Sequence, residues 1–122
     1  MSQARKCVLI VENEVIIADD ISRLVKELGH VPLSPAFSFN HAIDFFLMYL
    51  PDLVILDIRL NGHKSGIDFA HWVRSQFNTP IIFLTIFEDQ AHRNLGQGVL
   101  PISYLSKPFD DEQLKNAIQL AI

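Results

Sequence analysis

Four residues with reactive or charged side chains stand at or just beyond the ends of short apolar runs: Glu12, Asp57, Thr85 and Lys107. A carboxylate such as Asp57 can attack phosphorus as a nucleophile and become an aspartyl phosphate. Carboxylates are also ligands of Mg²⁺, which takes one or two of them and keeps several waters. An ammonium and a hydroxyl group can bind the oxygens of a phosphoryl group. If the fold brings these four side chains together, they are suited to phosphoryl transfer onto a carboxylate.

The apolar runs mark the predicted strands. Each is short, rich in Val, Ile or Leu, and bounded by polar or turn-forming residues, which is typical of strands buried in a parallel sheet. The runs are Cys7–Val11, Leu53–Leu56, Ile81–Leu84 and Ile102–Leu105, and a weaker strand is expected over His30–Ala36. Because the weaker strand contains Pro32 and Pro35, it belongs at a sheet edge, where missing N–H donors break no ladder.

Amphipathic segments with helical periodicity lie between these runs. Helices are predicted over Glu14–Leu28, from Ser38 or Asn40 to Leu50, over Ser65–Phe77, weakly over Glu88–Gly98, and over Asp110–Ile122. Strict alternation of strand and helix predicts an α/β fold, with a doubly wound five-stranded parallel sheet of order 2-1-3-4-5 and helices on both faces. Ligands of such sheets bind at the carboxyl ends of the strands, beside the switch point between strands 1 and 3. The four residues should therefore converge there, although each alone is commonly a cap, loop or surface residue.

Composition defines the broad class of protein. The 122 residues are 49% hydrophobic and 20% charged, which predicts one globular domain over 1–122 and excludes disorder. Cys7 is the only cysteine, so an internal disulfide is excluded and a reducing compartment is expected. A net charge of −4 makes the domain by itself a poor binder of nucleic acid. The sequence has no apolar run of bilayer-spanning length and no signal-peptide cleavage site, so we expect a cytoplasmic protein without membrane contact.

On these motifs the chain resembles a response-regulator receiver domain of two-component signalling over essentially its whole length. The resemblance is carried by Val-Leu-Ile-Val-Glu-Asn-Glu at 8–14, Leu-Val-Ile-Leu-Asp-Ile-Arg-Leu at 53–60, Ile-Ile-Phe-Leu-Thr at 81–85 and Tyr-Leu-Ser-Lys-Pro-Phe at 104–109. It implies that Asp57 accepts a phosphoryl group from a histidine kinase or phosphotransfer protein. It also implies Mg²⁺ held by the Glu12/Asn13 pair, Asp57 and the backbone carbonyl of Arg59.

The same resemblance implies a conformational switch. Thr85 and Tyr104 match the family's switch pair, in which the hydroxyl moves toward the phosphate and the aromatic ring turns inward. Lys107 matches the phosphate-binding lysine, and the Lys107–Pro108 bond is usually cis in the family. Such a domain is a signalling phosphoacceptor, with no enzyme activity beyond its own phosphorylation and dephosphorylation. Its signalling face, which can also form a homodimer, would comprise Glu88–Gly98, Ile102–Leu105 and Asp110–Ile122.

Three positions depart from the family pattern. Asn13 stands where a second acid is usual, so the site loses one charge and should hold Mg²⁺ less tightly. Ile86 replaces a small residue, and together with Phe87 it is expected to narrow access to Asp57 and to slow phosphorylation, dephosphorylation or both. Leu100-Pro101 replaces a Gly-Ala pair, which predicts an unusual geometry of the signalling face.

Two other classes of function remain open. The first is a pseudo-receiver, a phosphorylation-independent interaction module of the same fold, motivated by Asn13 and Ile86. The second is an enzyme or cofactor protein of another class. A metal-dependent phosphohydrolase is disfavoured because Arg59 stands where a general acid would follow Asp57. A flavodoxin-like cofactor protein is disfavoured because no Ser/Thr/Gly-rich phosphate loop follows the first strand.

Overall fold

A five-stranded parallel sheet forms the centre of the protein. The computed structural model describes residues 5–59, 65–85 and 103–122. The strands are β1 (Cys7–Val11), β2 (Val31–Pro32), β3 (Leu53–Asp57), β4 (Ile81–Thr85) and β5 (Ser103–Ser106). Their order is β2-β1-β3-β4-β5, and every pair is parallel. This confirms the predicted sheet.

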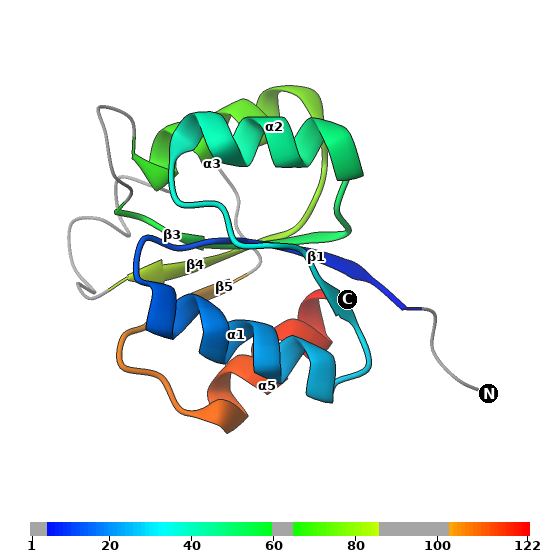
Figure 1. Ribbon diagram of the computed structural model, residues 1–122, viewed down its shortest axis with the longest axis vertical. Helices are drawn as coiled ribbons and strands as arrows, with labels where there is room; N and C mark the ends of the chain where they lie inside the picture. Colours follow the sequence, from blue (N-terminus) through cyan, green and yellow to red (C-terminus); the bar gives the residue numbers. More distant parts are fainter. Residues whose placement is uncertain (1–4, 60–64, 86–102) are drawn as a thin grey trace.

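Helices cover both faces of the sheet. The described ones are α1 (Val15–Glu27), α2 (Phe39–Tyr49), α3 (Gly66–Gln76) and α5 (Asp111–Ala121). Figure 1 shows α2 and α3 on one face and α1 and α5 on the other. Side chains of β1 alternate between the two layers, because successive strand residues point to opposite faces. Leu9 and Val11 join the core beneath α2 and α3, whereas Val8 and Ile10 join the core beneath α1 and α5.

Local sequence signals explain where the helices begin. Ser38, one of the two predicted caps, accepts a hydrogen bond from the His41 N–H at the start of α2. Asp110 forms a capping box with Gln113 at the start of α5, as Ser65 does with Asp68 at the start of α3. The predicted helix over Glu88–Gly98 lies outside the described residues, as do Ile86, Phe87 and Leu100-Pro101.

Strand β2 is shorter than predicted. The expected strand over His30–Ala36 is reduced to Val31–Pro32 and a single bridge between Val11 and Ala36. The Leu33 N–H donates to the Val8 carbonyl, and a regular register would make residue 35 the next donor. Pro35 has no N–H, and Ala36 donates to the Ile10 carbonyl instead, so the ladder is interrupted between these two pairings. The bridge still shapes the site, since the Ala36 carbonyl accepts a hydrogen bond of 3.0 Å from the backbone N–H of Glu12.

The start of α3 is packed directly against the end of β3. The Gly66 N–H donates a 2.7 Å hydrogen bond to the Ile58 carbonyl. A methyl group at Gly66 would collide with the Asp57 carbonyl oxygen and would lie 2.9 Å from the Ile58 Cα. Only glycine permits this approach, so Gly66 helps to fix the backbone that carries Asp57.

Candidate functional site

The sheet register aligns the carboxyl ends of four strands. Val11 pairs with Leu56, Asp57 with Leu84, and Thr85 with Ser106. The four predicted residues Glu12, Asp57, Thr85 and Lys107 therefore lie at the same edge of the sheet. The side chains of the first three are withdrawn from solvent, since Glu12 is 0%, Asp57 5% and Thr85 4% exposed.

Lys107 joins the two carboxylates. Its Nζ donates 3.0 Å hydrogen bonds to Asp57 Oδ2 and to Glu12 Oε1. It also lies 2.9 Å from Glu12 Oε2, but the geometry of that contact is not that of a hydrogen bond. Glu12 Oε2 is thus a fully buried carboxylate oxygen without a hydrogen-bond donor. One ammonium therefore compensates two buried carboxylates that come from different strands.

Backbone groups hold the same side chains in place. The Arg59 N–H donates to Asp57 Oδ1 at 3.0 Å, and the Glu14 N–H donates to Glu12 Oε1 at 3.2 Å. The Lys107 N–H donates to the Thr85 carbonyl at 2.8 Å, which ties the connection after β5 to the end of β4. The Lys107–Pro108 bond is cis, as predicted. Main-chain N–H groups therefore fix the two carboxylates, and a backbone hydrogen bond joins Thr85 to Lys107.

Burial controls the protonation of this cluster. It raises the pKa of Glu12 to about 7; the hydrogen bond from Lys107 opposes this shift and the nearby Asp57 carboxylate adds to it. Burial acts to lower the pKa of Lys107, but its bonds to Glu12 and Asp57 outweigh that effect, so the pKa is raised overall. Lys107 is consequently a permanent cation in the site.

Tyr104 lies one strand position before Leu105 on β5 and is partly buried. Its ring stacks on Phe83, with centroids 5.8 Å apart and planes at 19°. Burial raises the pKa of the Tyr104 hydroxyl. The sequence alone gives Phe83 no role beyond its place in an apolar strand. Its position two residues before Thr85 does indicate that the two side chains share a face of the sheet, because residues i and i+2 of a strand point the same way.

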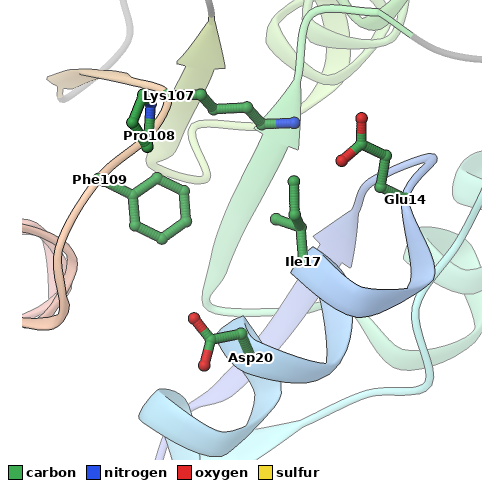
Figure 2. Close-up of a pocket in the computed structure, with 6 residues that line it drawn as sticks. All are labelled: Glu14, Ile17, Asp20, Lys107, Pro108 and Phe109. Atoms are coloured by element: carbon green, nitrogen blue, oxygen red, sulfur yellow. The ribbon is translucent and has the colours of Figure 1, made fainter.

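A pocket of about 290 Å³ adjoins the site. Figure 2 shows its lining: Glu14 at the N-cap of α1, Ile17 and Asp20 from α1, and Lys107, Pro108 and Phe109 from the connection between β5 and α5. The pocket therefore has an apolar floor and two carboxylates on the α1 side. Sequence analysis gave no role to Ile17, Asp20 or Phe109, because their proximity depends on how α1 packs beside the β5–α5 connection.

The fold and the site together define a flavodoxin-like receiver, and comparisons with known proteins agree. The family model described as the response regulator receiver domain matches residues 8–119. The chain therefore belongs to the response-regulator receiver family of two-component signalling. Members of this family are signalling modules and not classical enzymes. They interact with histidine kinases or phosphotransfer proteins, and they generally bind Mg²⁺ in an acidic pocket.

Individual relatives are similar over nearly all of the chain. The transcriptional regulatory protein PdtaR of Mycobacterium tuberculosis (strain ATCC 25618 / H37Rv) is 32% identical over 115 residues, covering 94% of this chain and 56% of that protein. The signal receiver domain of a modulated diguanylate cyclase from Desulfovibrio desulfuricans G20 has a TM-score of 0.87 at 29% identity, covering 98% of this chain and 94% of that one. The response regulator PhyR from Brucella abortus has a TM-score of 0.85 at 32% identity, covering 98% of this chain and 48% of that one. The chain thus spans about half the length of PdtaR.

Glu12 and Asp57 have the chemistry of Mg²⁺ ligands. Within 5–59, 65–85 and 103–122, no group of three or more His, Cys, Asp or Glu side chains is suited to a metal. Mg²⁺ needs fewer, since one or two carboxylates and a carbonyl oxygen suffice when waters complete the shell. Glu12 and Asp57 are the carboxylates, and the buried Glu12 Oε2 still lacks a hydrogen-bond donor.

None of the described helices has both the length and the apolar character needed to cross a membrane.

Proposed function

We propose that this domain is a phosphoacceptor that receives a phosphoryl group on Asp57 from a histidine kinase or phosphotransfer protein. The observation that carries the proposal is the Glu12–Lys107–Asp57 cluster, in which a nearly buried carboxylate is 3.0 Å from a fixed ammonium. Such a pair is rarely retained for stability alone, because desolvation of the charges offsets most of their attraction. It does suit a site where a dianionic group must be received.

The chemistry needs little more than placement and charge. A carboxylate oxygen of Asp57 attacks phosphorus, the bond from phosphorus to the donor nitrogen breaks, and its electron pair returns to the donor imidazole. The product is an acyl phosphate. Lys107 then binds a phosphoryl oxygen, and the Thr85 hydroxyl donates to another. Mg²⁺, when bound through Glu12, Asn13, Asp57 and the Arg59 carbonyl, would neutralise charge on the phosphoryl oxygens.

The response to phosphorylation would run through Thr85 and Tyr104. A new group of about −1.5 to −2 charge draws Lys107 and Thr85 toward it, and this rearrangement biases the surface around Tyr104. We assign the signalling face, and a homodimer where one forms, to the segment 88–98 together with β5 and α5. We also assign the whole span 1–122 to one receiver domain that acts in the cytoplasm, without direct contact to nucleic acid or membrane.

The pocket beside α1 is the proposed binding site of the phosphodonor protein. Ile17 and Phe109 offer apolar contact next to Lys107, and Glu14 and Asp20 favour a basic residue on the donor. Glu14→Lys should slow transfer from a kinase roughly tenfold, since rim charges act mainly on association. Transfer from a small anionic donor should not become slower. Equal slowing of transfer from both donors in Glu14→Lys would contradict this binding site. Asp44→Lys, the same charge change on α2, is the control and should not slow transfer from the kinase.

Intact-mass analysis tests the function. The protein is incubated with a small-molecule phosphodonor, with and without Mg²⁺, and then with a phosphorylated kinase domain. We expect a Mg²⁺-dependent gain of one phosphoryl group that Asp57→Ala abolishes and Asp44→Ala leaves intact, because Asp44 is an exposed residue of α2. No gain with either donor would overturn the proposal.

The second candidate is a pseudo-receiver that binds a partner without phosphorylation. The neutral Asn13 favours it, because Lys107 already compensates the two remaining carboxylates and the site gains less from a metal ion. A partner complex that is independent of Mg²⁺ and persists in Asp57→Ala would support it.

A further inference from the structure

Phe83 and Tyr104 are direct neighbours across two parallel strands. They are Cα partners in the register of β4 and β5, so both side chains stand on the same face of the sheet. Their rings are nearly parallel, at 19°, with centroids 5.8 Å apart. Offset stacking at this separation is one of the favoured geometries of aromatic pairs.

The surrounding core holds the Phe83 ring in place. Phe83 is 0% exposed and belongs to the core beneath α2 and α3, together with Phe46 and Phe69. It also shares its face with Thr85, two residues further along β4. Phe83 is therefore a neighbour of Thr85 along β4 and of Tyr104 across the β4–β5 pair.

The stacked orientation is one of two that the Tyr104 side chain can adopt. Tyr104 lies on β5, the outermost strand of the described sheet, whereas Phe83 lies on β4 with neighbours on both sides. A side chain on an edge strand can rotate off the sheet into solvent. The stacked ring is instead partly buried against the core that contains Phe83.

We infer that Phe83 is a positioning residue that holds the Tyr104 ring over the sheet before a phosphoryl group arrives. The inference deepens the proposed function and rests on it only for its consequence in signalling. The inward arrangement then belongs to the resting domain, and phosphorylation acts on a tyrosine that is already turned in. An aromatic pair of this kind should favour the inward ring by roughly 2- to 10-fold over a flexible apolar neighbour.

NMR of the protein labelled with ¹³C in the tyrosine rings tests the inference. The chain has two tyrosines, and Tyr49, 51% exposed on α2, is an internal reference. In the wild type we expect contacts between ring protons of Tyr104 and Phe83, and a Tyr104 signal moved upfield by the Phe83 ring. The absence of these contacts would overturn the inference without any variant.

Phe83→Met removes the flat ring but keeps an apolar side chain of similar size. Because loss of the Phe83 ring current changes the Tyr104 shift in any case, the readout is broadening of the tyrosine ring signals by a soluble paramagnetic agent. We expect the Tyr104 ring to become more accessible to the agent, while the accessibility of Tyr49 stays unchanged. Phe69→Met is the matched control, because Phe69 is equally buried in the same core but stacks on Trp72. Equal exposure of the Tyr104 ring in both variants would mean general loosening of the core and would overturn the inference, as would unchanged exposure in Phe83→Met.

Adding Mg²⁺ and a phosphodonor separates this inference from the proposed function. The accessibility of the wild-type Tyr104 ring should change little, and the ring in Phe83→Met should become less accessible. If intact mass shows no phosphoryl group, the proposed function fails, and the comparison without donor still decides the role of Phe83. A large change in the accessibility of Tyr104 in the phosphorylated wild type would overturn the inference and leave the phosphoacceptor role intact.

Discussion

The ammonium of Lys107 lies 3.0 Å from the carboxylate of Asp57, although 50 positions separate the two residues in the sequence. The ion pair is nearly closed to solvent, with the two side chains 11% and 7% exposed. Glu12 completes it from the end of β1. Lys107 therefore partly balances the two carboxylates, and a phosphoryl group or a metal ion would compete with these contacts.

Removing Lys107 should be costly. Lys107→Met leaves two buried carboxylates facing each other without a cation, and we expect a loss of about 3 kcal/mol in the free energy of unfolding at pH 8. Lys115→Met is the control, because its ion pair with Glu27 is accessible to solvent, with the two side chains 28% and 41% exposed, and should contribute little to stability. Chemical denaturation of both variants measures the difference. Similar losses would contradict a special role for the buried pair.

The charge at position 13 should set the affinity for Mg²⁺. Asn13→Asp adds a second acid beside Glu12, and we expect roughly tenfold tighter binding from the added attraction. Isothermal titration calorimetry at constant ionic strength provides the measurement. Asn13→Ala, which removes the amide oxygen, should bind more weakly than the wild type. Unchanged affinity in Asn13→Asp would place the metal away from this residue.

Glu12 should give stability an unusual dependence on pH. Its pKa rises from 4.5 in the unfolded chain to about 7 in the folded protein, so the folded state binds the proton more tightly. This contribution is fully present below pH 4.5 and is lost as the pH rises through 7, and it amounts to something on the order of 2 kcal/mol. We compare denaturation of the wild type and Glu12→Gln from pH 5 to 8. In Glu12→Gln the free energy of unfolding should lose this dependence on pH. An identical pH dependence in the wild type and the variant would refute the raised pKa of Glu12.

Gly66 should matter for Asp57 as well as for folding. Gly66→Ala places a methyl group against the Asp57 carbonyl, and we expect a loss of about 2–3 kcal/mol and slower phosphorylation. Gly29→Ala is a useful contrast, because no atom lies within 4 Å of the added methyl and the cost arises from its φ of +88°. That variant should lose about 1–2 kcal/mol but keep its phosphorylation rate. Slower phosphorylation in both would show that stability alone controls the rate.

Much of this architecture could be predicted because its signals are local. Buried strands such as Leu53–Asp57 are apolar along their length, and helix starts such as Ser38 and Asp110 carry their own caps. The parallel order then places the strand ends together. The structure and the family comparisons therefore confirm the predicted fold and family, and the roles of the site residues stay predictions.

The remaining features depend on contacts between distant segments. The length of β2 was overestimated because the effect of each proline on the ladder depends on which N–H groups face β1. The Lys107 bridge to both carboxylates depends on the path of a long, flexible side chain. The Phe83–Tyr104 stack requires the register of β4 and β5, which periodicity in one strand does not give.

The most direct test of the account is to locate the phosphoryl group chemically. The protein is phosphorylated by a kinase domain in Mg²⁺, treated with borohydride, which reduces an acyl phosphate to an alcohol, and digested for peptide mapping. The account predicts homoserine at position 57, only when donor and Mg²⁺ are both present. A phosphoryl group at another residue, or an unmodified Asp57 with both donors, would contradict it.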